Sequence, residues 1–160
     1  MSHFINYLKQ FNDKKINIYI DMDGVVADYD MLGFEGNKDN SDVYLNKRPV
    51  TTTIKVLEEV NNLKNVNLYI LSVARCENQI PGKVKWLEKN MSFITKEQIN
   101  ILPREGNDFK PAHELKRIFL KGNINQDEIN IMIDDSHTVL YDLNKSGINV
   151  IPLHITSILD

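Results

Sequence analysis

Two aspartates, Asp21 and Asp23, directly follow the apolar run I-N-I-Y-I. Carboxylates this close together repel each other, and a bound cation or protonation of one of them relieves the repulsion. A second acidic pair, Asp134 and Asp135, follows the apolar run I-N-I-M-I near the end of the chain. Clustered carboxylate oxygens suit a hard cation such as Mg²⁺, which proteins hold through one or two carboxylates together with substrate phosphate. The two acidic pairs therefore indicate magnesium-assisted phosphate chemistry, if the fold brings them together.

The elements around these acids alternate between short apolar runs and amphipathic segments, a pattern typical of βαβ units. Strands are predicted at 16–20, 66–71, 99–102, 130–133 and 148–151. Helices are predicted at 52–64, 83–90, 111–121 and 137–145, and a short N-terminal one on the spacing of Phe4, Ile5, Leu8 and Phe11. The pattern predicts an α/β fold with helices on both faces of a five-stranded parallel sheet, a three-layer, doubly wound, Rossmann-like architecture.

Local signals mark the expected ends of these helices. Thr51 or Thr52 is available as the N-cap of the helix after the first strand, and Ser136 as the N-cap of the last helix. Gly122 and Gly147 stand where the last two helices are expected to have ended.

Polar side chains stand at the ends of three predicted strands. Asp21 follows the first strand, Ser72 the second and Asp134 the fourth. In a doubly wound parallel sheet the carboxyl ends of the strands share one edge, and ligands bind at that edge where the strand order switches. We therefore expect these side chains to lie together, with lysines contributed by the loops.

The length and composition indicate one domain that spans residues 1–160. The chain of 160 residues is 42% hydrophobic and 26% charged, which is ordinary for a globular domain with a proper core. One segment, about 29–48, is polar and contains glycines, and it interrupts the alternation of strands and helices. It is predicted to be a small surface insert of uncertain structure.

The sequence favours a cytoplasmic protein. There is one cysteine, so no internal disulfide can form, and no apolar run is long enough to cross a bilayer. The N-terminus lacks the pattern of a signal peptide. A net charge of −3 argues against a broad nucleic-acid or membrane-binding surface, and nothing indicates an obligate protein partner.

Three motifs resemble those of the haloacid dehalogenase (HAD) superfamily. The stretch D-M-D-G-V-V-A-D at 21–28 resembles motif I, DxDx(V/T), while L-Y-I-L-S and I-M-I-D-D resemble motifs II and IV. Their order and their positions at strand ends match over roughly 16–151. The resemblance implies a HAD core with a minimal cap insert and a Mg²⁺-dependent phosphatase activity.

The resemblance also implies a role for each motif residue. Asp21 would be the nucleophile that forms an aspartyl-phosphate, and Asp23 the general acid and then the base. The metal set would be Asp21, the backbone carbonyl of Asp23, and Asp134, with Asp135 as a secondary partner. Ser72 would bind a phosphoryl oxygen. This chemistry needs Asp21 ionised and Asp23 protonated, which neighbouring charges and the metal can arrange.

Two lysines are candidates for the lysine of the third HAD motif, motif III. Lys110, in F-K-P-A-H-E-L, resembles the Lys-Pro form that is common in the superfamily, and it follows the third predicted strand. Lys83, in G-K-V-K-W-L-E-K, resembles the lysine-containing helix of the 5′(3′)-deoxyribonucleotidases. The position at the sheet edge favours Lys110 as the phosphate-binding lysine, and Lys83 stays open.

Two kinds of phosphatase share further features with this chain. The deoxyribonucleotidases have the same D-M-D-G-V-x-A-D stretch and a K-x-x-W helix, here Lys83 to Trp86. The phosphatase domain of phage polynucleotide kinase has a similarly short insert and stretches like K-W-L-E at 85–88 and R-E-G at 104–106. These resemblances imply a small phosphorylated substrate, either a nucleotide or a nucleic-acid end.

Two other classes of protein remain as alternatives. A non-catalytic HAD-fold protein that binds phosphate or nucleotide would not need to keep the acid, and Asp23 is present. A receiver-like phospho-acceptor domain would carry its phospho-acceptor after the third strand, where this chain reads I-N-I-L-P-R without an aspartate. Both alternatives are weaker than the phosphatase.

Overall fold

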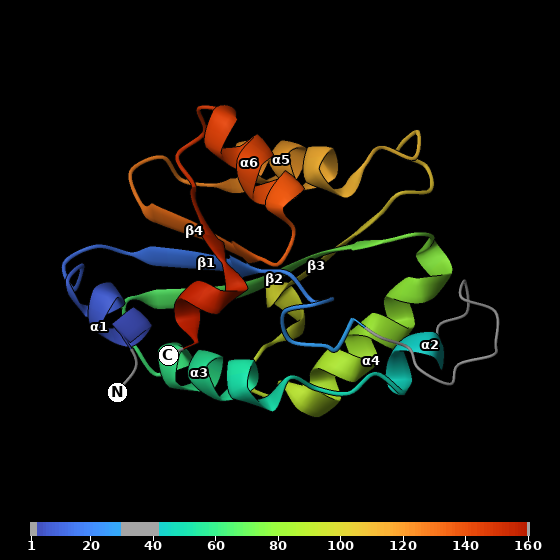
Figure 1. The fold of residues 1–160 in the computed structure, drawn as a ribbon, viewed down its shortest axis with the longest axis horizontal. Helices are drawn as coiled ribbons and strands as arrows, with labels where there is room; N and C mark the ends of the chain where they lie inside the picture. Colours follow the sequence, from blue (N-terminus) through green and yellow to red (C-terminus); the bar gives the residue numbers. More distant parts are fainter. Residues whose placement is uncertain (1–2, 30–41, 160) are drawn as a thin grey trace.

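The computed structural model, which describes residues 3–29 and 42–159, contains a five-stranded parallel sheet in the order β3-β2-β1-β4-β5 (Figure 1). The strands are β1 (Ile16–Ile20), β2 (Val66–Ala74), β3 (Ile99–Pro103), β4 (Ile129–Asp134) and β5 (Ile151–His154). After β3 the chain crosses to the other side of β1, so the strand order switches between β1 and β4. The predicted α/β, Rossmann-like fold class is confirmed.

Helices cover both faces of the sheet (Figure 1). The helices are α1 (His3–Lys9), α2 (Asp42–Leu45), α3 (Thr51–Asn61), α4 (Ile80–Asn90), α5 (Ala112–Asn123) and α6 (His137–Lys145). Short 3-10 turns lie at Glu77–Gln79, Lys96–Gln98 and Ile155–Ile158. Figure 1 shows α5 and α6 together on one face, with α1, α3 and α4 on the other. Three layers result, and the sheet is the middle one.

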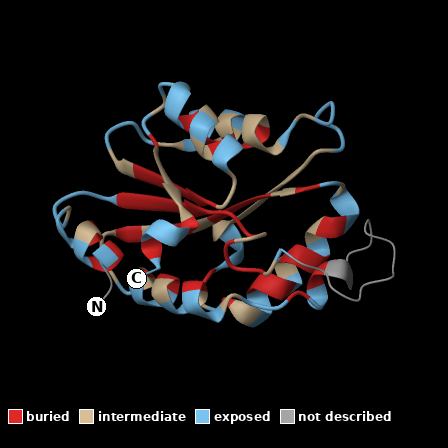
Figure 2. Ribbon diagram, viewed as in Figure 1, coloured by how far each residue is buried: buried red, intermediate tan, exposed pale blue. Residues whose placement is uncertain are grey.

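The alternation of side chains along the strands gives each helical layer its own core. Ile16, Ile18 and Ile20 of β1 are fully buried in the cluster shared with α1, α3 and α4. Tyr19, between them, belongs to the cluster under α5 and α6. β1 is buried at every position and β4 at all but its first, and both lie among the red elements in the middle of Figure 2. A parallel sheet buried on both faces in this way needs apolar residues at nearly every position.

A row of asparagines fixes the register of the three central strands. Asn17 of β1 pairs with Asn67 of β2 and with Asn130 of β4. The amide of Asn67 donates to Asn17, and the amide of Asn17 donates in turn to Asn130, both at 3.2 Å. Asn17 also donates to Glu128 at 2.6 Å. Because buried amides need partners, a slip of one residue would leave them unsatisfied.

The boundaries of two strands differ from the prediction. β5 begins at Ile151, three residues later than expected, because Gly147 adopts φ +72° and Val150 donates to Ile148 in a tight turn. β2 extends to Ala74, which pairs with Pro103, so Ser72 lies inside the strand and not after its end.

The predicted helix ends are partly wrong. Val50 precedes α3, and neither Thr51 nor Thr52 caps it, since both lie within the helix. Gly122 lies inside α5, which runs on to Asn123. Ser136 is the N-cap residue of α6, as predicted, but its side chain makes no cap hydrogen bond.

The end of the predicted insert 29–48 is exposed at Leu45, Asn46 and Arg48 but buries two side chains. Residues 30–41 lie outside the described residues, but α2 packs beside α4, and both Tyr44 and Lys47 are buried at 8% exposure. The indole of Trp86 on α4 donates to the backbone carbonyl of Lys47 at 2.8 Å. The polar composition of the segment did not reveal these two inward side chains.

The part of the chain that the structure describes holds no helix long and apolar enough to span a membrane.

We predict that Thr53→Val stabilises the protein by about 1 kcal/mol. Thr53 is fully buried, and its hydroxyl has no hydrogen-bond partner among the described residues. Replacing an unsatisfied buried hydroxyl by a methyl group of the same shape removes a desolvation cost. Chemical denaturation measures the change, and Thr51→Val at an exposed position of the same helix is the control. A loss of stability in Thr53→Val would show that the hydroxyl is satisfied.

Candidate active site

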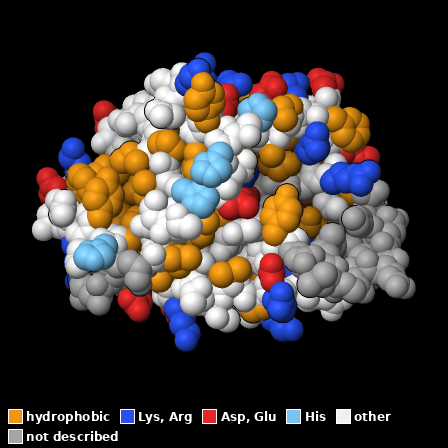
Figure 3. All heavy atoms as spheres, viewed as in Figure 1, with side chains coloured by type: hydrophobic (Ala, Val, Ile, Leu, Met, Phe, Trp, Pro, Cys, Tyr) orange, Lys and Arg blue, Asp and Glu red, His pale blue; other side chains and the backbone are white. Residues whose placement is uncertain are grey.

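The carboxyl ends of the strands surround a cavity of about 270 Å³. Its lining residues come from the ends of β2 and β4, from the loops after β1, β3 and β4, and from α5 and α6: Asp21, Asp23, Tyr29, Val73, Arg104, Ala112, Lys116, Asp134, Asp135, Ser136 and Val139. Figure 3 shows histidine and carboxylate side chains gathered near the middle of this face, between the two helical layers. The cavity lies at the switch in strand order, where a ligand site is expected in this fold.

Three carboxylates at this edge form a potential metal site. Asp21 follows β1 and Asp134 ends β4, and these two strands are neighbours in the sheet. One oxygen each from Asp21, Asp134 and Asp135 lie within 4.8 Å of one another. A set of carboxylate oxygens fits Mg²⁺ in its chemistry, because this ion prefers hard oxygen ligands. The expected role of the Asp23 backbone carbonyl as a further ligand stays a prediction.

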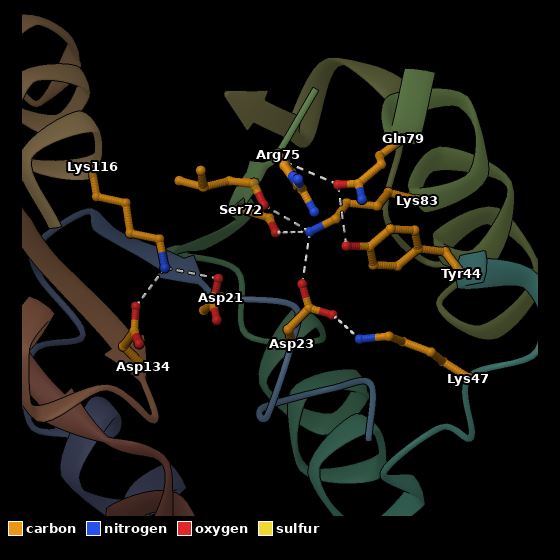
Figure 4. A network of polar contacts seen from close by, with 11 residues as sticks. Asp21, Asp23, Tyr44, Lys47, Ser72, Arg75, Gln79, Lys83, Lys116 and Asp134 are labelled. Atoms are coloured by element: carbon orange, nitrogen blue, oxygen red, sulfur yellow. Dashed lines mark hydrogen bonds and ion pairs between the residues drawn. The ribbon is translucent and has the colours of Figure 1, made fainter. Parts of the chain in front are cut away.

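A buried lysine that the sequence reasoning missed bridges two of these acids. The amine of Lys116 on α5 donates to Asp21 Oδ1 at 2.8 Å and to Asp134 Oδ2 at 2.6 Å, and the residue is 3% exposed (Figure 4). The available signal was helical periodicity, since Lys116 stands with Leu115 and Leu120 on the buried face of α5. A lysine at such a position requires a buried acid as its partner.

A second buried lysine organises the other side of the cavity. The Lys83 amine donates to Asp23 Oδ2 at 2.7 Å, to Ser72 Oγ at 2.9 Å and to the carbonyl of Val73 at 2.9 Å. Lys83 lies on α4 and is fully buried. The structure therefore brings Ser72, Lys83 and Asp23 together, as Figure 4 shows.

Lys110, the favoured motif III lysine, does not join this cluster. Its amine pairs with Asp108 at 3.3 Å, on the loop between β3 and α5. The guanidinium of Arg104 binds the carbonyls of Phe109 and Lys110, both at 3.0 Å, and so fixes the course of this loop. The assignment of Lys110 as the motif III lysine stays a prediction. The lysine that reaches the carboxylates in the structure is Lys116, on α5.

Asp23 also meets a lysine from the end of the insert. Lys47 Nζ lies 2.5 Å from Asp23 Oδ1, and its side chain is 6% exposed. The amines of both Lys47 and Lys83 lie near the ring of Tyr44, at 4.9 and 4.7 Å from its centre. Sequence reasoning missed Lys47 and Tyr44, which carry no motif signal.

Burial and charge in the protein alone shift the pKa values of Asp21 and Asp23 in directions opposite to those that the expected chemistry needs. Burial raises the pKa of Asp21 to about 6; Lys116 opposes this shift and Asp134 adds to it. Burial would also raise the pKa of Asp23, but the amines of Lys83 and Lys47 outweigh it and hold the pKa below its usual value. A divalent cation beside Asp21 would favour its ionised form. Asp23 is an ion-paired carboxylate in the protein alone, and not the protonated acid that was expected.

Gly24 allows the motif I loop to pass close to Asp135. Its φ is +81°, and a Cβ built on it would lie 2.2 Å from Asp135 Oδ2. The loop turns back at once, because the amides of Val26 and Ala27 both donate to the carbonyl of Met22. A glycine after the second aspartate is therefore a steric requirement of this acidic cluster.

Comparison with known proteins finds a similarity of fold to a solved structure. No family model matches the chain, and no curated protein matches it. A solved structure described as the Pnkp1/Rnl/Hen1 RNA repair complex contains a chain that is similar in fold, with a TM-score of 0.64 at 15% identity. The likeness covers 89% of this chain and 43% of that chain, so this chain spans less than half of its length.

We predict that Mg²⁺ stabilises the protein more at about pH 7.5 than at about pH 5. The folded-state pKa of Asp21 lies above its usual value, so between about pH 4 and 6 the folded protein binds a proton that the unfolded chain does not hold. This proton stabilises the folded protein at low pH, and the stabilisation is lost as the pH rises through about 6. The metal requires the ionised form, and its apparent affinity falls about tenfold for each pH unit below the pKa. Thermal unfolding with and without Mg²⁺ measures the effect.

At about one hundred times its dissociation constant a ligand adds about 2.7 kcal/mol to the free energy of unfolding, and about 1.4 kcal/mol of this is lost for each tenfold loss in affinity. Asp134→Asn is the control, since it removes a carboxylate of the site and is expected to abolish the stabilisation. Equal stabilisation by Mg²⁺ at both pH values would contradict a metal site that includes Asp21.

Proposed function

We propose that this protein is a Mg²⁺-dependent phosphomonoesterase of the HAD superfamily, which works through an aspartyl-phosphate on Asp21. The observation that carries the proposal is the meeting of Asp21, Asp134 and Asp135 with the buried amine of Lys116 at the switch in strand order. Three acids from the ends of β1 and β4 and a lysine from α5, all at one cavity, are typical of a phosphoryl-transfer site.

In the proposed reaction each side chain has a defined task. An oxygen of Asp21 attacks phosphorus while Lys116 holds Oδ1 of the same carboxylate. Ser72 and Lys83 bind phosphoryl oxygens. A hydrogen bond of 2.9 Å holds the amine of Lys83 next to the hydroxyl of Ser72, so both groups can act on the same phosphate. Asp23 gives a proton to the leaving oxygen and then takes one from the water that attacks the aspartyl-phosphate. Bound Mg²⁺ would neutralise and orient the phosphoryl group.

The proposed substrate is a phosphate at the end of a nucleotide or nucleic acid. The support is the likeness of fold to a chain of an RNA repair complex, together with the chain's resemblance to nucleotidases and to the phosphatase domain of phage polynucleotide kinase. Tyr29 lines the cavity and is 72% exposed, so it offers an aromatic face at the entrance. Arg104 lines the same cavity and adds positive charge.

The ion pairs of Asp23 favour a second candidate function, a phosphate-binding protein without turnover. An acid that two lysines hold ionised lacks the proton that a leaving alcohol needs. A binder would retain phosphorylated ligands and release no phosphate from them. The same assay separates the two functions.

We expect phosphate release from at least one class in a panel of mononucleotides, 3′-phosphorylated oligonucleotides and sugar phosphates. Release should vanish in Asp21→Asn and in chelator, since each removes a group that the chemistry needs. The best substrate class decides between a mononucleotide and a nucleic-acid end. Release that persists in Asp21→Asn would refute the nucleophile, and binding without release in the wild-type protein would support the second candidate.

We expect Lys116→Met to lower kcat/KM by about 10²-fold or more, the usual effect of losing a charged group that stabilises the transition state. Lys110→Met, which removes an equal charge from the neighbouring loop, should change kcat/KM less than about threefold, because exposed ion pairs contribute little. Steady-state kinetics on the best substrate measure both. A larger loss in Lys110→Met than in Lys116→Met would restore Lys110 as the functional lysine.

A further inference from the structure

The carboxylate of Asp23 is held at both of its oxygens by buried amines. Lys83 binds Oδ2, and Lys47 binds Oδ1. The Lys83 amine is shared with Ser72 and the carbonyl of Val73, whereas the Lys47 amine lies between Asp23 and the rings of Tyr44 and Tyr29. Lys83 thus links Asp23 to Ser72. Lys47 has no part in the reaction as proposed above.

The backbone of Lys47 is fixed to two other parts of the site. Its carbonyl accepts from the indole of Trp86 on α4, and its amide donates to the carbonyl of Tyr44. The residues that follow run against the motif I loop: the amide of Asp28 donates to the carbonyl of Arg48, and the amide of Val50 donates to the carbonyl of Val26, both at 2.8 Å. The segment that carries Lys47 is therefore held against the loop that carries Asp23 by backbone hydrogen bonds.

Lys47 does not line the cavity. Like Ser72 and Lys83 it is absent from the lining, and its side chain is 6% exposed, whereas that of Asp23 is 21% exposed and lines the cavity. Figure 4 shows Lys47 approaching Asp23 from the side opposite Lys116. Because the ion pair of Lys47 is with Asp23, we expect its effect on the chemistry to pass through Asp23.

We propose that Lys47 is a positioning residue that fixes Asp23 for proton transfer to the leaving oxygen, so that the segment after α2 controls this step. The inference rests on the proposed function. In the step concerned, an Asp21 oxygen bonds to phosphorus and the ester P–O bond breaks. Asp23, an ion-paired carboxylate in the protein alone, first takes up a proton from solvent. The leaving oxygen then keeps the bonding electrons and takes this proton, and the restored carboxylate of Asp23 faces Lys47 and Lys83.

Dependence on the leaving group tests this role. A sugar alkoxide leaves poorly without a proton, whereas p-nitrophenolate leaves well as an anion, so general acid catalysis matters much more for the sugar ester. We would measure kcat/KM, which reports the first chemical step, for p-nitrophenyl phosphate and for the sugar phosphate ester that the wild-type protein hydrolyses best.

We expect Lys47→Met to lower kcat/KM for the sugar ester about 10–100-fold and for the aryl ester less than about threefold. Lys47→Arg, which keeps the charge, should recover most of the loss. In an Asp23→Asn background, Lys47→Met should have no further effect on either ester, because the residue acts through Asp23. Lys47→Gln replaces Lys47→Met if that variant does not fold.

Arg48→Met is the matched control. Arg48 is the next cation on the same segment, but it pairs with Asp28 at 2.7 Å near the surface. Its loss should leave the ratio of the kcat/KM values for the two esters unchanged. Equal losses on both esters in Lys47→Met, or a further loss in the Asp23→Asn background, would overturn the role of Lys47 alone. A wild-type protein that hydrolyses neither ester would overturn the proposed function, and this inference with it.

Discussion

The mutual repulsion of carboxylates at one edge of a buried sheet is the constraint on which the rest of the site depends. Asp21 and Asp134 are almost completely shielded from water, and they end neighbouring strands. Charges that are buried without partners cost several kcal/mol each, so such a cluster persists only where opposite charges reach it. Lys116 meets this need by bridging both acids. Lys116 is thus required for the fold to tolerate these acids.

The same constraint explains why the site has two halves. On one side Lys116 neutralises the acids of β1 and β4, and on the other side Lys83 and Lys47 neutralise Asp23. The two halves come from opposite layers of the fold, since Lys116 lies on α5 while Lys83 lies on α4. Asp21 and Asp23 are only two residues apart, and yet the first has a raised pKa and the second a lowered one. Burial raises the pKa of Asp21, whereas two amines hold down the pKa of Asp23, so the surroundings separate the properties of two chemically identical groups.

The sheet and its acids could be predicted from the sequence because both are local signals. The strand I-N-I-Y-I is apolar throughout, and the acids after it must lie at the carboxyl edge wherever a parallel sheet forms. The lysines could not be placed in the same way. A lysine amine lies several bonds from its Cα, so the contact it makes depends on the packing angle of its helix, which the sequence does not specify. Lys116 and Lys47 were missed for this reason, and Lys110 was chosen because it stands closest to a predicted strand end.

The balance of charge in the cluster explains how such a site can take both a metal and a phosphate. Among the described residues, the carboxyls of Asp21, Asp23, Asp134 and Asp135 meet the amines of Lys47, Lys83 and Lys116, and the guanidinium of Arg104 at the same cavity balances the fourth acid. A dianionic phosphate that entered this cluster alone would therefore meet no net attraction. Once a divalent cation is bound, the net charge is positive and the dianion is attracted. Under the proposed function, the carboxylates that make the site costly to fold are therefore also the groups that make phosphate binding depend on the metal.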